Sequence, residues 1–421
     1  MCPSTTVRPP SGTSGDDECT QTSQSNHGLV EVAVANETPV SSRAHYQILG
    51  ESDCRIWGLR ISDTLQGLLR DAGVEPLDPA EKFPDDRADT IILRGDHFLD
   101  RCAVQLLLAS NSTVIVQPRG ATAVQPVAVR CAGCDADRWR DLLLGDAVER
   151  TTLPAIGQII DATSPPPVYD YEMRKKSLPF IRKVTRESCR EIEHRTFELA
   201  YKGVTDLVTK YVYPWPAFHA TRLAVRLGLT PNTITFASLL LVFAVLEMFV
   251  RGQLAAGLVL GFAMSFLDTL DGKLARVTQT SSRFGKHFDH LIDLIHPPFW
   301  WLAWWWGAAG SQPPAGWNEA AAVCVLGYLA VRVQEWRFKR RLGVRIHVWR
   351  RFDSHFRLIT TRRNPNLLLL SVALLAGNPQ LGLFWLAGWT LLSFAVHAVR
   401  WAQAEIEVHR TGRLESWLES A

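Results

Sequence analysis

The most informative pattern in this 421-residue chain reads D-T-L-D-G-K-L-A-R at residues 268–276 and, after eight more residues, G-K-H-F-D-H-L-I-D at 285–293. Apolar runs long enough for a membrane flank it. If both halves are helical, spacings of three and four residues place the carboxylates of each half on one helix face. The intervening loop turns the chain back, so the two faces could meet.

Four carboxylates crowded beside hydrocarbon repel one another and need protons or cations as neighbours. They belong to Asp268, Asp271, Asp289 and Asp293. Oxygen-only ligand sets suit Mg²⁺ or Mn²⁺ better than zinc, and these ions commonly hold phosphate groups. The sequence therefore predicts two such ions. The alternative, helix-end carboxylates paired with nearby Lys and Arg, leaves the cost of these charges unexplained.

Small residues and a cation accompany the carboxylates. Gly272 and Ala275 share the first face, which leaves room for a bulky ligand near the backbone. Arg276 supplies a fixed positive charge for a phosphate oxygen.

The complete spacing, D-x2-D-G-x2-A-R-x8-G-x3-D-x3-D, resembles the signature of the CDP-alcohol phosphotransferase family. These are integral membrane enzymes that make phospholipids and release CMP. Thr230-Pro231-Asn232 and Thr235 resemble the P-N-x-x-T entry to the family's first membrane helix. The resemblance covers about the C-terminal half of the chain and implies a six-helix membrane domain in which the Asp set holds two divalent ions.

The resemblance also implies roles for single residues. Asp293 would be the general base that deprotonates an attacking hydroxyl. The CDP part of the donor would lie against Asn232, Gly272, Ala275, Arg276 and Gly285.

Cations near this region predict how an acceptor is held. Ten Lys or Arg lie between residues 337 and 363, and guanidinium groups match the geometry of phosphate. The resemblance implies phosphorylated acceptors such as an inositol or glycerol phosphate. We expect the acceptor to contact Arg283, Lys286, Arg362 and Arg363.

A second feature points to a different substrate. The segment D-H-x-x-D at 289–293, followed by Leu294, is similar to choline and ethanolamine phosphotransferases. The sequence therefore leaves open which substrate carries the lipid.

Apolar runs recur from about Ile234 and predict six membrane spans, near residues 234–251, 254–271, 290–309, 318–336, 366–378 and 381–401. Several are shorter than the roughly 20 residues that a span needs, which implies a polar cavity. Lys and Arg gather in the loops 273–286 and 337–363. The positive-inside rule then predicts a multi-pass cell-membrane protein with the Asp site and both termini on the cytoplasmic side. No nucleic-acid partner is expected, and a homodimer is left open.

Aromatic and proline residues follow the last Asp of the motif. Pro297 and Pro298 remove the donors to the carbonyls of Asp293 and Leu294, which could then serve a ligand, although a helix kink is the preferred interpretation. Five tryptophans lie between residues 300 and 306, and we expect them to anchor the helix at the membrane interface.

The N-terminal part of the sequence predicts a disordered segment and a soluble domain rather than membrane helices. Residues 1–48 are rich in Ser, Thr, Gly and Pro, so we expect disorder, and no secretory signal is apparent. Residues 49–163 predict a soluble α/β domain. Its expected strands lie at 56–59, 91–93 and 113–117, and its helices near 62–72, 98–109 and 136–144. The C-x-x-C at Cys131 and Cys134 lacks a second pair for zinc, so an incidental pair of reduced thiols is expected.

The segment from Ile91 to Asp96 resembles the strand-to-loop element of nucleotidyltransferases, where an Asp holds the metal. No Gly-rich phosphate cradle precedes it, so we expect a degenerate, catalytically silent domain with a structural Asp96. Residues 164–229 predict a linker and membrane-surface amphipathic helices, one of them near 174–195, with the membrane domain at 230–410 and a tail at 411–421.

The leading interpretation is an enzyme that joins a CDP-activated alcohol to a hydroxyl acceptor. Two alternatives remain: a bifunctional enzyme with an active cytidylyltransferase domain, and a non-enzymatic membrane protein that binds cations or lipids.

Overall fold

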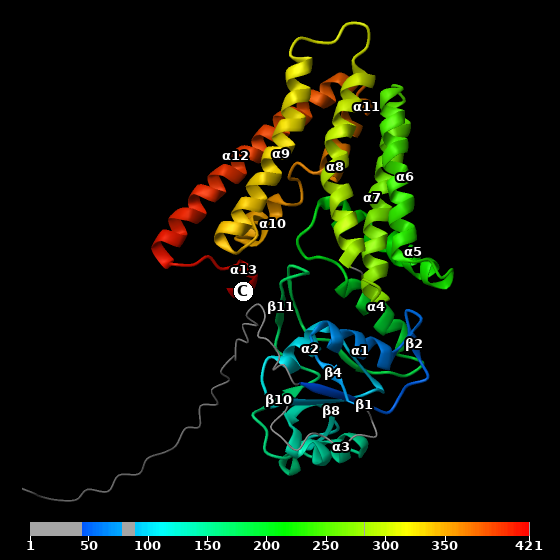
Figure 1. Cartoon of the computed structure of the whole chain (residues 1–421), viewed down its shortest axis with the longest axis vertical. Helices are drawn as coiled ribbons and strands as arrows, with labels where there is room; N and C mark the ends of the chain where they lie inside the picture. The colour runs from blue at the N-terminus through cyan, green and yellow to red at the C-terminus, as the bar shows by residue number, and fades with distance from the viewer. Residues whose placement is uncertain (1–43, 78–88, 282, 421) are drawn as a thin grey trace, which may run out of the picture. The chain divides into compact units, whose positions relative to one another are not determined.

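A computed structural model describes residues 44–77, 89–281 and 283–420 of the chain, which form an α/β unit followed by long helices (Figure 1). Most of the segment predicted to be disordered, residues 1–43, lies outside the described residues. Its last part does not: the first strand, β1, begins at His45 rather than at residue 49.

The α/β unit is built on a seven-stranded mixed sheet with the order β10-β7-β8-β5-β1-β4, in which β9 pairs with β8. β1 is parallel to β4 and β5, and β10 is parallel to β7, whereas β8 is antiparallel to both β5 and β7. The strands are β1 (His45–Leu49), β4 (Glu75–Pro76), β5 (Asp89–Arg94), β7 (Thr113–Pro118), β8 (Ala123–Ala132), β9 (Val148–Glu149) and β10 (Gln158–Asp161).

Helices cover both faces of this sheet, because successive side chains of a strand point to opposite faces. Ile91 and Leu93 of β5 are buried with residues of α1 (Ile61–Asp71) and α2 (Arg101–Leu108). Between them, Ile92 is buried with Trp139 of α3 (Ala136–Leu144). The predicted α/β unit and its three helices are therefore confirmed.

Two strand predictions need correction. The expected strand at 56–59 is a hairpin of β2 (Arg55–Ile56) and β3 (Leu59–Arg60), because Trp57 and Gly58 adopt positive φ angles of 52° and 81° and turn the chain. The ten-residue β8 was not predicted. It contains Pro126, which sits opposite Val116 at a register irregularity, a position where a strand tolerates proline.

The surface helix predicted near 174–195 is wrong for its first half. The chain instead forms β12 (Lys175–Ser177), paired with β11 (Val168–Asp170), and β13 (Ile181–Lys183), paired with β6 (His97–Leu99). Only α4 (Cys189–Leu199) is helical. Ile181, Val184 and Ile192 are buried in the core of the α/β unit, so the apolar residues expected on a membrane are internal.

A surface helix does follow, immediately before the first long apolar helix. α5 (Pro214–Arg226) exposes Trp215 at 75% and Leu223 at 55% of their surfaces. Exposed aromatic and aliphatic side chains beside Arg222 and Arg226 suit the boundary between lipid headgroups and water.

The C-terminal part contains six main helices. They are α6 (Pro231–Val250), α7 (Leu254–Val277), α8 (Arg283–Ala308), α9 (Trp317–Leu342), α11 (Arg363–Leu375) and α12 (Pro379–Thr411), with the short α10 (Arg351–Phe356) and α13 (Trp417–Ser420) beside them. α6 packs on α7 and α8, and α9 packs on α12 (Figure 1). The Thr230 hydroxyl accepts from the backbone N–H of Thr233, and Pro231 fills the first turn, so α6 starts at the predicted motif.

Among the described residues, three helices are long and apolar enough to cross a membrane: α6, α7 and α12. The six predicted spans each overlap a helix, but α11 has 13 residues and is only about 20 Å long. The second half of α9 carries Arg332 and Glu335 together with a basic C-terminal turn. A helical membrane part is therefore clear, whereas its number of crossings stays a prediction.

The expected interfacial position of the tryptophans is wrong for three of the five. Trp300, Trp301 and Trp304 are buried between the helices, because they share the inner face of α8. The indole of Trp300 donates to the Val242 carbonyl at 3.1 Å, and that of Trp304 donates to the Pro379 carbonyl at 3.2 Å. Trp306 is 64% exposed and keeps a position suited to an interface.

Candidate active site

Two helix faces meet at the carboxylates, as their spacing predicts. Asp268 lies in α7, and Asp289 and Asp293 lie about one turn apart in α8. One carboxylate oxygen from each lies within 4.8 Å of the other two. Asp293 keeps 40% of its side chain exposed, compared with 16% for Asp268.

The fourth predicted ligand, Asp271, has a different partner. Its carboxylate accepts a hydrogen bond of 2.5 Å from the Thr235 hydroxyl of α6, and it is buried. Thr235 belongs to the motif at the start of α6, so the two parts of the predicted signature touch through this bond. The converging group of three carboxylates does not include Asp271.

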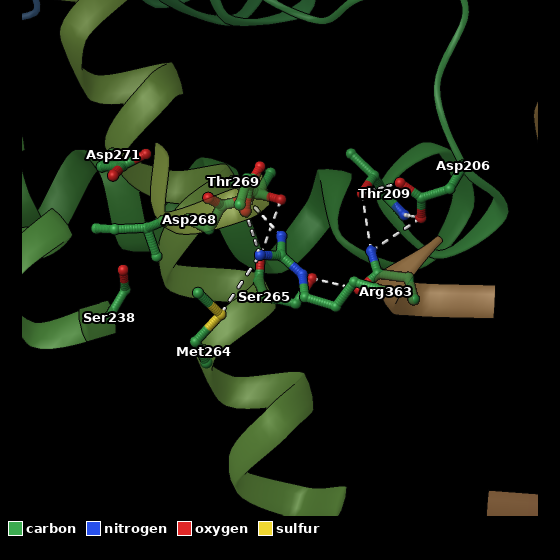
Figure 2. A network of polar contacts seen from close by, with 12 residues as sticks. Asp206, Thr209, Ser238, Met264, Ser265, Asp268, Thr269, Asp271 and Arg363 are labelled. Atoms are coloured by element: carbon green, nitrogen blue, oxygen red, sulfur yellow. Dashed lines mark hydrogen bonds and ion pairs between the residues drawn. The ribbon is translucent and has the colours of Figure 1, made fainter. Parts of the chain in front are cut away.

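Arg363, the first residue of α11, joins the carboxylates of both helices. One guanidinium nitrogen donates to Asp293 and the other donates to Asp268, each at 2.6 Å. The next residue, Asn364, fixes this helix start, because its amide donates to Asp206 at 2.9 Å and its oxygen accepts from Ser265. Figure 2 shows this network, with Asp271 on the side of Ser238.

The donor set fits a divalent cation. Three carboxylates and one guanidinium leave two negative charges in a partly buried site, and all the converging ligand atoms are oxygens. Hard cations such as Mg²⁺ and Mn²⁺ prefer this set.

The end of α7 docks on the α/β unit. Arg276 and Lys273 donate to the carbonyl of Ala200, at 2.9 and 3.1 Å, and the Lys273 ammonium lies 3.3 Å from the centre of the Tyr201 ring. Ala200 caps the C-terminus of α4, where helix carbonyls attract cations. Val277 is buried in the core of the α/β unit, so α7 is anchored there by its apolar end as well.

Three of the five residues predicted to hold the donor, Gly272, Ala275 and Arg276, lie in this end of α7. The Arg276 guanidinium lies over Gly272, where a Cβ would come within 3.2 Å of one of its nitrogens. Ala275 is half-buried beside them, and Gly285 is half-buried in the first turn of α8. Asn232 is exposed in the first turn of α6.

The four predicted acceptor residues separate. The side chains of Arg283 and Lys286 lie outside those described. Arg363 contacts the carboxylate site, whereas Arg362 donates to Glu335 of α9 at 2.5 Å.

The partners of Arg362 form a second charged cluster. Glu335 also accepts from Arg332 at 3.0 Å, and its other oxygen lies 2.9 Å from a ring nitrogen of His347. Glu335 and His347 were not predicted. A usable signal was present, because Arg332 and Glu335 stand three residues apart directly after the apolar run 320–331.

Cations outnumber carboxylates in this cluster. Arg332, Arg357 and Arg362 each have buried N–H groups with no partner among the described residues. Arg174, from the loop between β11 and β12, lies nearby: burial, followed by the charges of Arg345 and Arg362, lowers its pKa to about 10. Buried guanidinium groups with spare donors favour a bound anion.

In the α/β unit, the carboxylate of Asp96 already has two protein partners. Asp96 accepts from Arg94 at 2.9 and 3.0 Å and lies 2.7 Å from a ring nitrogen of His97. Burial raises the pKa of Asp96, but the hydrogen bonds from His97 and Arg94 outweigh it and hold this pKa well below its usual range. The geometry agrees with the structural role predicted for Asp96.

Known proteins are similar to the C-terminal part of the chain, which contains this site. The sequence profile of the CDP-alcohol phosphatidyltransferase family matches residues 228–396, which contain all four Asp of the motif. An archaetidylinositol phosphate synthase of Pyrococcus horikoshii is 43% identical over 68 residues, 16% of this chain. The chain spans only 36% of that relative's length.

Two solved structures of Mycobacterium tuberculosis phosphatidylinositol phosphate synthase are similar at 20% identity. The one with CDP-DAG bound has a TM-score of 0.36 and is matched over 43% of this chain and 91% of that chain. The one with manganese and citrate has a TM-score of 0.35, over 43% and 87%. Residues 228–396 therefore match the CDP-alcohol phosphatidyltransferase family in profile and in motif, and three carboxylates of that motif meet in the structure.

Proposed function

We propose that this chain moves a phospho-alcohol group of the phosphatidyl type from a CDP-linked donor to a hydroxyl acceptor and releases CMP, as a step of phospholipid biosynthesis. The carrying observation is the convergence of Asp268, Asp289 and Asp293 from two helices of the family domain.

The residues divide the chemistry among them. Asp293 is the more exposed of the two carboxylates that Arg363 joins. It serves as the general base that takes the proton of the acceptor hydroxyl. Arg363 orients it through the 2.6 Å bond. Two Mg²⁺ or Mn²⁺ ions, held by the three converging carboxylates and Asp271, would neutralise charge on the pyrophosphate. Asn232, Gly272, Ala275, Arg276 and Gly285 bind the CDP part.

For the acceptor, we propose a phosphorylated polyol. The buried N–H groups of Arg332, Arg357 and Arg362 offer charged donors for its phosphate. The name of the curated relative, an archaetidylinositol phosphate synthase, supports this class. A neutral lipid alcohol is the second candidate, favoured by the D-H-x-x-D segment at 289–293.

We further propose that all six main helices cross a cell membrane, with the Asp site and both termini in the cytoplasm. The basic loops 273–286 and 337–363 support this orientation. Reporter fusions at Pro313 and Asn378 should then report the outside, and one at Gly343 the inside. An outside signal at Gly343 would contradict the topology.

The decisive experiment measures CMP release by the purified protein in lipid nanodiscs. We expect release from a CDP-linked diacylglycerol with inositol phosphate or glycerol phosphate, its loss with EDTA, and its return with Mg²⁺ or Mn²⁺. Cation or lipid binding without CMP release would instead support the non-enzymatic alternative. Turnover of CTP with an alcohol phosphate would support the bifunctional one.

A further inference from the structure

Two carbonyls of α8 lose their helical partners beside the proposed base. α8 continues through Pro297 and Pro298 to Ala308, although neither proline has an N–H group. The carbonyls left without that donor are those of Asp293 and Leu294, four residues earlier. A buried carbonyl without a partner costs roughly as much as a lost hydrogen bond.

A single side chain on a neighbouring helix reaches both and shares its one hydroxyl proton between them. The hydroxyl of Tyr328, in α9, lies 3.2 Å from the Asp293 carbonyl oxygen and 3.4 Å from that of Leu294. Tyr328 is only 4% exposed. Its hydroxyl therefore supplies one shared donor where two backbone N–H groups are missing, at the residue that carries the proposed base.

The Tyr328 side chain also touches the second charged cluster, which Arg362 forms with Glu335, Arg332 and His347. The guanidinium carbon of Arg332 lies 5.3 Å from the centre of the Tyr328 ring. Tyr328 thus has two separable contacts: the hydroxyl to the backbone of α8, and the ring to Arg332. Removing only the hydroxyl tests the first contact and leaves the second in place.

We propose that Tyr328 is a positioning residue, which acts through the Asp293 carbonyl to hold the turn of α8 that aims the Asp293 carboxylate. This inference rests on the proposed function of Asp293. The carboxylate then has two anchors, Arg363 on the side chain and Tyr328 on the backbone. Small errors in the position of a reacting group lower the rate more than they lower substrate binding.

The first test is Tyr328→Phe, measured by CMP release in nanodiscs. We expect kcat to fall about tenfold, while KM for the donor and the acceptor each change less than about twofold. Tyr213→Phe is the matched control, because its buried hydroxyl likewise donates to a helix carbonyl, that of Phe262 in α7, at 3.1 Å. The control should keep kcat within about twofold.

The second test restores the missing donors. In the Tyr328→Phe background, Pro297→Ala and Pro298→Ala supply backbone N–H groups to the Asp293 and Leu294 carbonyls. We expect the triple variant to recover most of the lost kcat. A tyrosine that acted through Arg332 or through general packing would gain nothing from these alanines.

The outcomes are distinguishable. An unchanged kcat in Tyr328→Phe, an equal loss in Tyr213→Phe, or no recovery in the triple variant would each overturn the inference while leaving the proposed function intact. Absence of CMP release from the wild-type protein would refute the proposed function itself.

Discussion

The α/β unit and the helical part each place aspartate beside arginine, but in different proportions. In the α/β unit, Arg94 binds both oxygens of one carboxylate, that of Asp96. In the helical part, Arg363 divides its two donors between Asp268 and Asp293, and Asp289 converges on the same point. The first arrangement is complete by itself, whereas the second retains negative charge for a further cation. The contrast shows that the ratio of charges, rather than the presence of an ion pair, distinguishes the candidate site from a structural pair.

The largest effect is expected from substitutions in the converging carboxylates. Asp293→Asn keeps the shape but not the basicity, so CMP release should fall by roughly 10²–10⁴-fold. Asp289→Ala should abolish release by removing a metal ligand. Both variants should insert in the membrane normally, as judged by extraction and size-exclusion behaviour. More than about a tenth of the wild-type rate in Asp293→Asn would contradict its role as the base.

A second prediction concerns Arg362 and the second charged cluster. Arg362→Ala should raise KM for a phosphorylated acceptor by about one to two orders of magnitude, because a charged hydrogen bond contributes roughly 1.5–3 kcal/mol. KM for the CDP donor should barely move. Arg350→Ala is the matched control, since Arg350 forms an exposed pair with Glu407 in the same region and should have little effect. Equal losses against both substrates would indicate a structural role, and a preference for a neutral lipid alcohol would favour the second acceptor class.

A smaller effect is expected where the two parts of the chain touch. Tyr201→Leu removes the ring that faces the Lys273 ammonium and should loosen the end of α7 that carries Arg276. A cation–π contact of this kind contributes about 1–2 kcal/mol, so KM for the donor should rise roughly five- to thirtyfold. Steady-state kinetics at saturating acceptor measures the change. Tyr171→Leu, whose ring meets Arg345 away from α7, supplies the control. An unchanged donor KM would mean that α7 keeps its position without this contact.

The smallest effect on activity is expected from a substitution in the Arg94–Asp96 ion pair of the α/β unit. Asp96→Ala should leave the lipid product unchanged, because Asp96 is fully used by Arg94 and His97. It should lower the free energy of unfolding of the α/β unit by about 1–3 kcal/mol, as measured by chemical denaturation. A CTP turnover that disappears in Asp96→Ala would show that the domain is catalytic after all.

Periodicity predicted the parts of the structure that depend on one helix at a time. The spacing of Asp268, Asp289 and Asp293 fixed their faces, and the motif at Thr230 and Pro231 located the start of α6. These features follow from 3.6 residues per turn and from local capping, which the sequence displays directly.

The parts that depend on tertiary partners were missed. Trp300 and Trp304 look like interfacial residues until the carbonyls of Val242 and Pro379 are seen to accept from their indoles. Ile181 fits the pattern of an amphipathic helix in the sequence, but its segment forms β13, which pairs with β6. The spacing of Arg332 and Glu335 hinted at a charged cluster, but the contact of Glu335 with Arg362, which is distant in the sequence, could not be predicted. Pairing between distant segments leaves little periodic trace in a single chain.

The docking of α7 on the α/β unit has a consequence for biosynthesis. Chains emerge from the ribosome N-terminus first, so α4 and the sheet are complete before α7 is made. Until α7 is made, the place in this core that Val277 fills is empty, and the Ala200 carbonyl lacks its donors Lys273 and Arg276. The α/β unit would thereby offer a preformed docking site for the end of α7, the helix that carries Asp268. A chain that lost this unit would have to assemble its carboxylates without a guide.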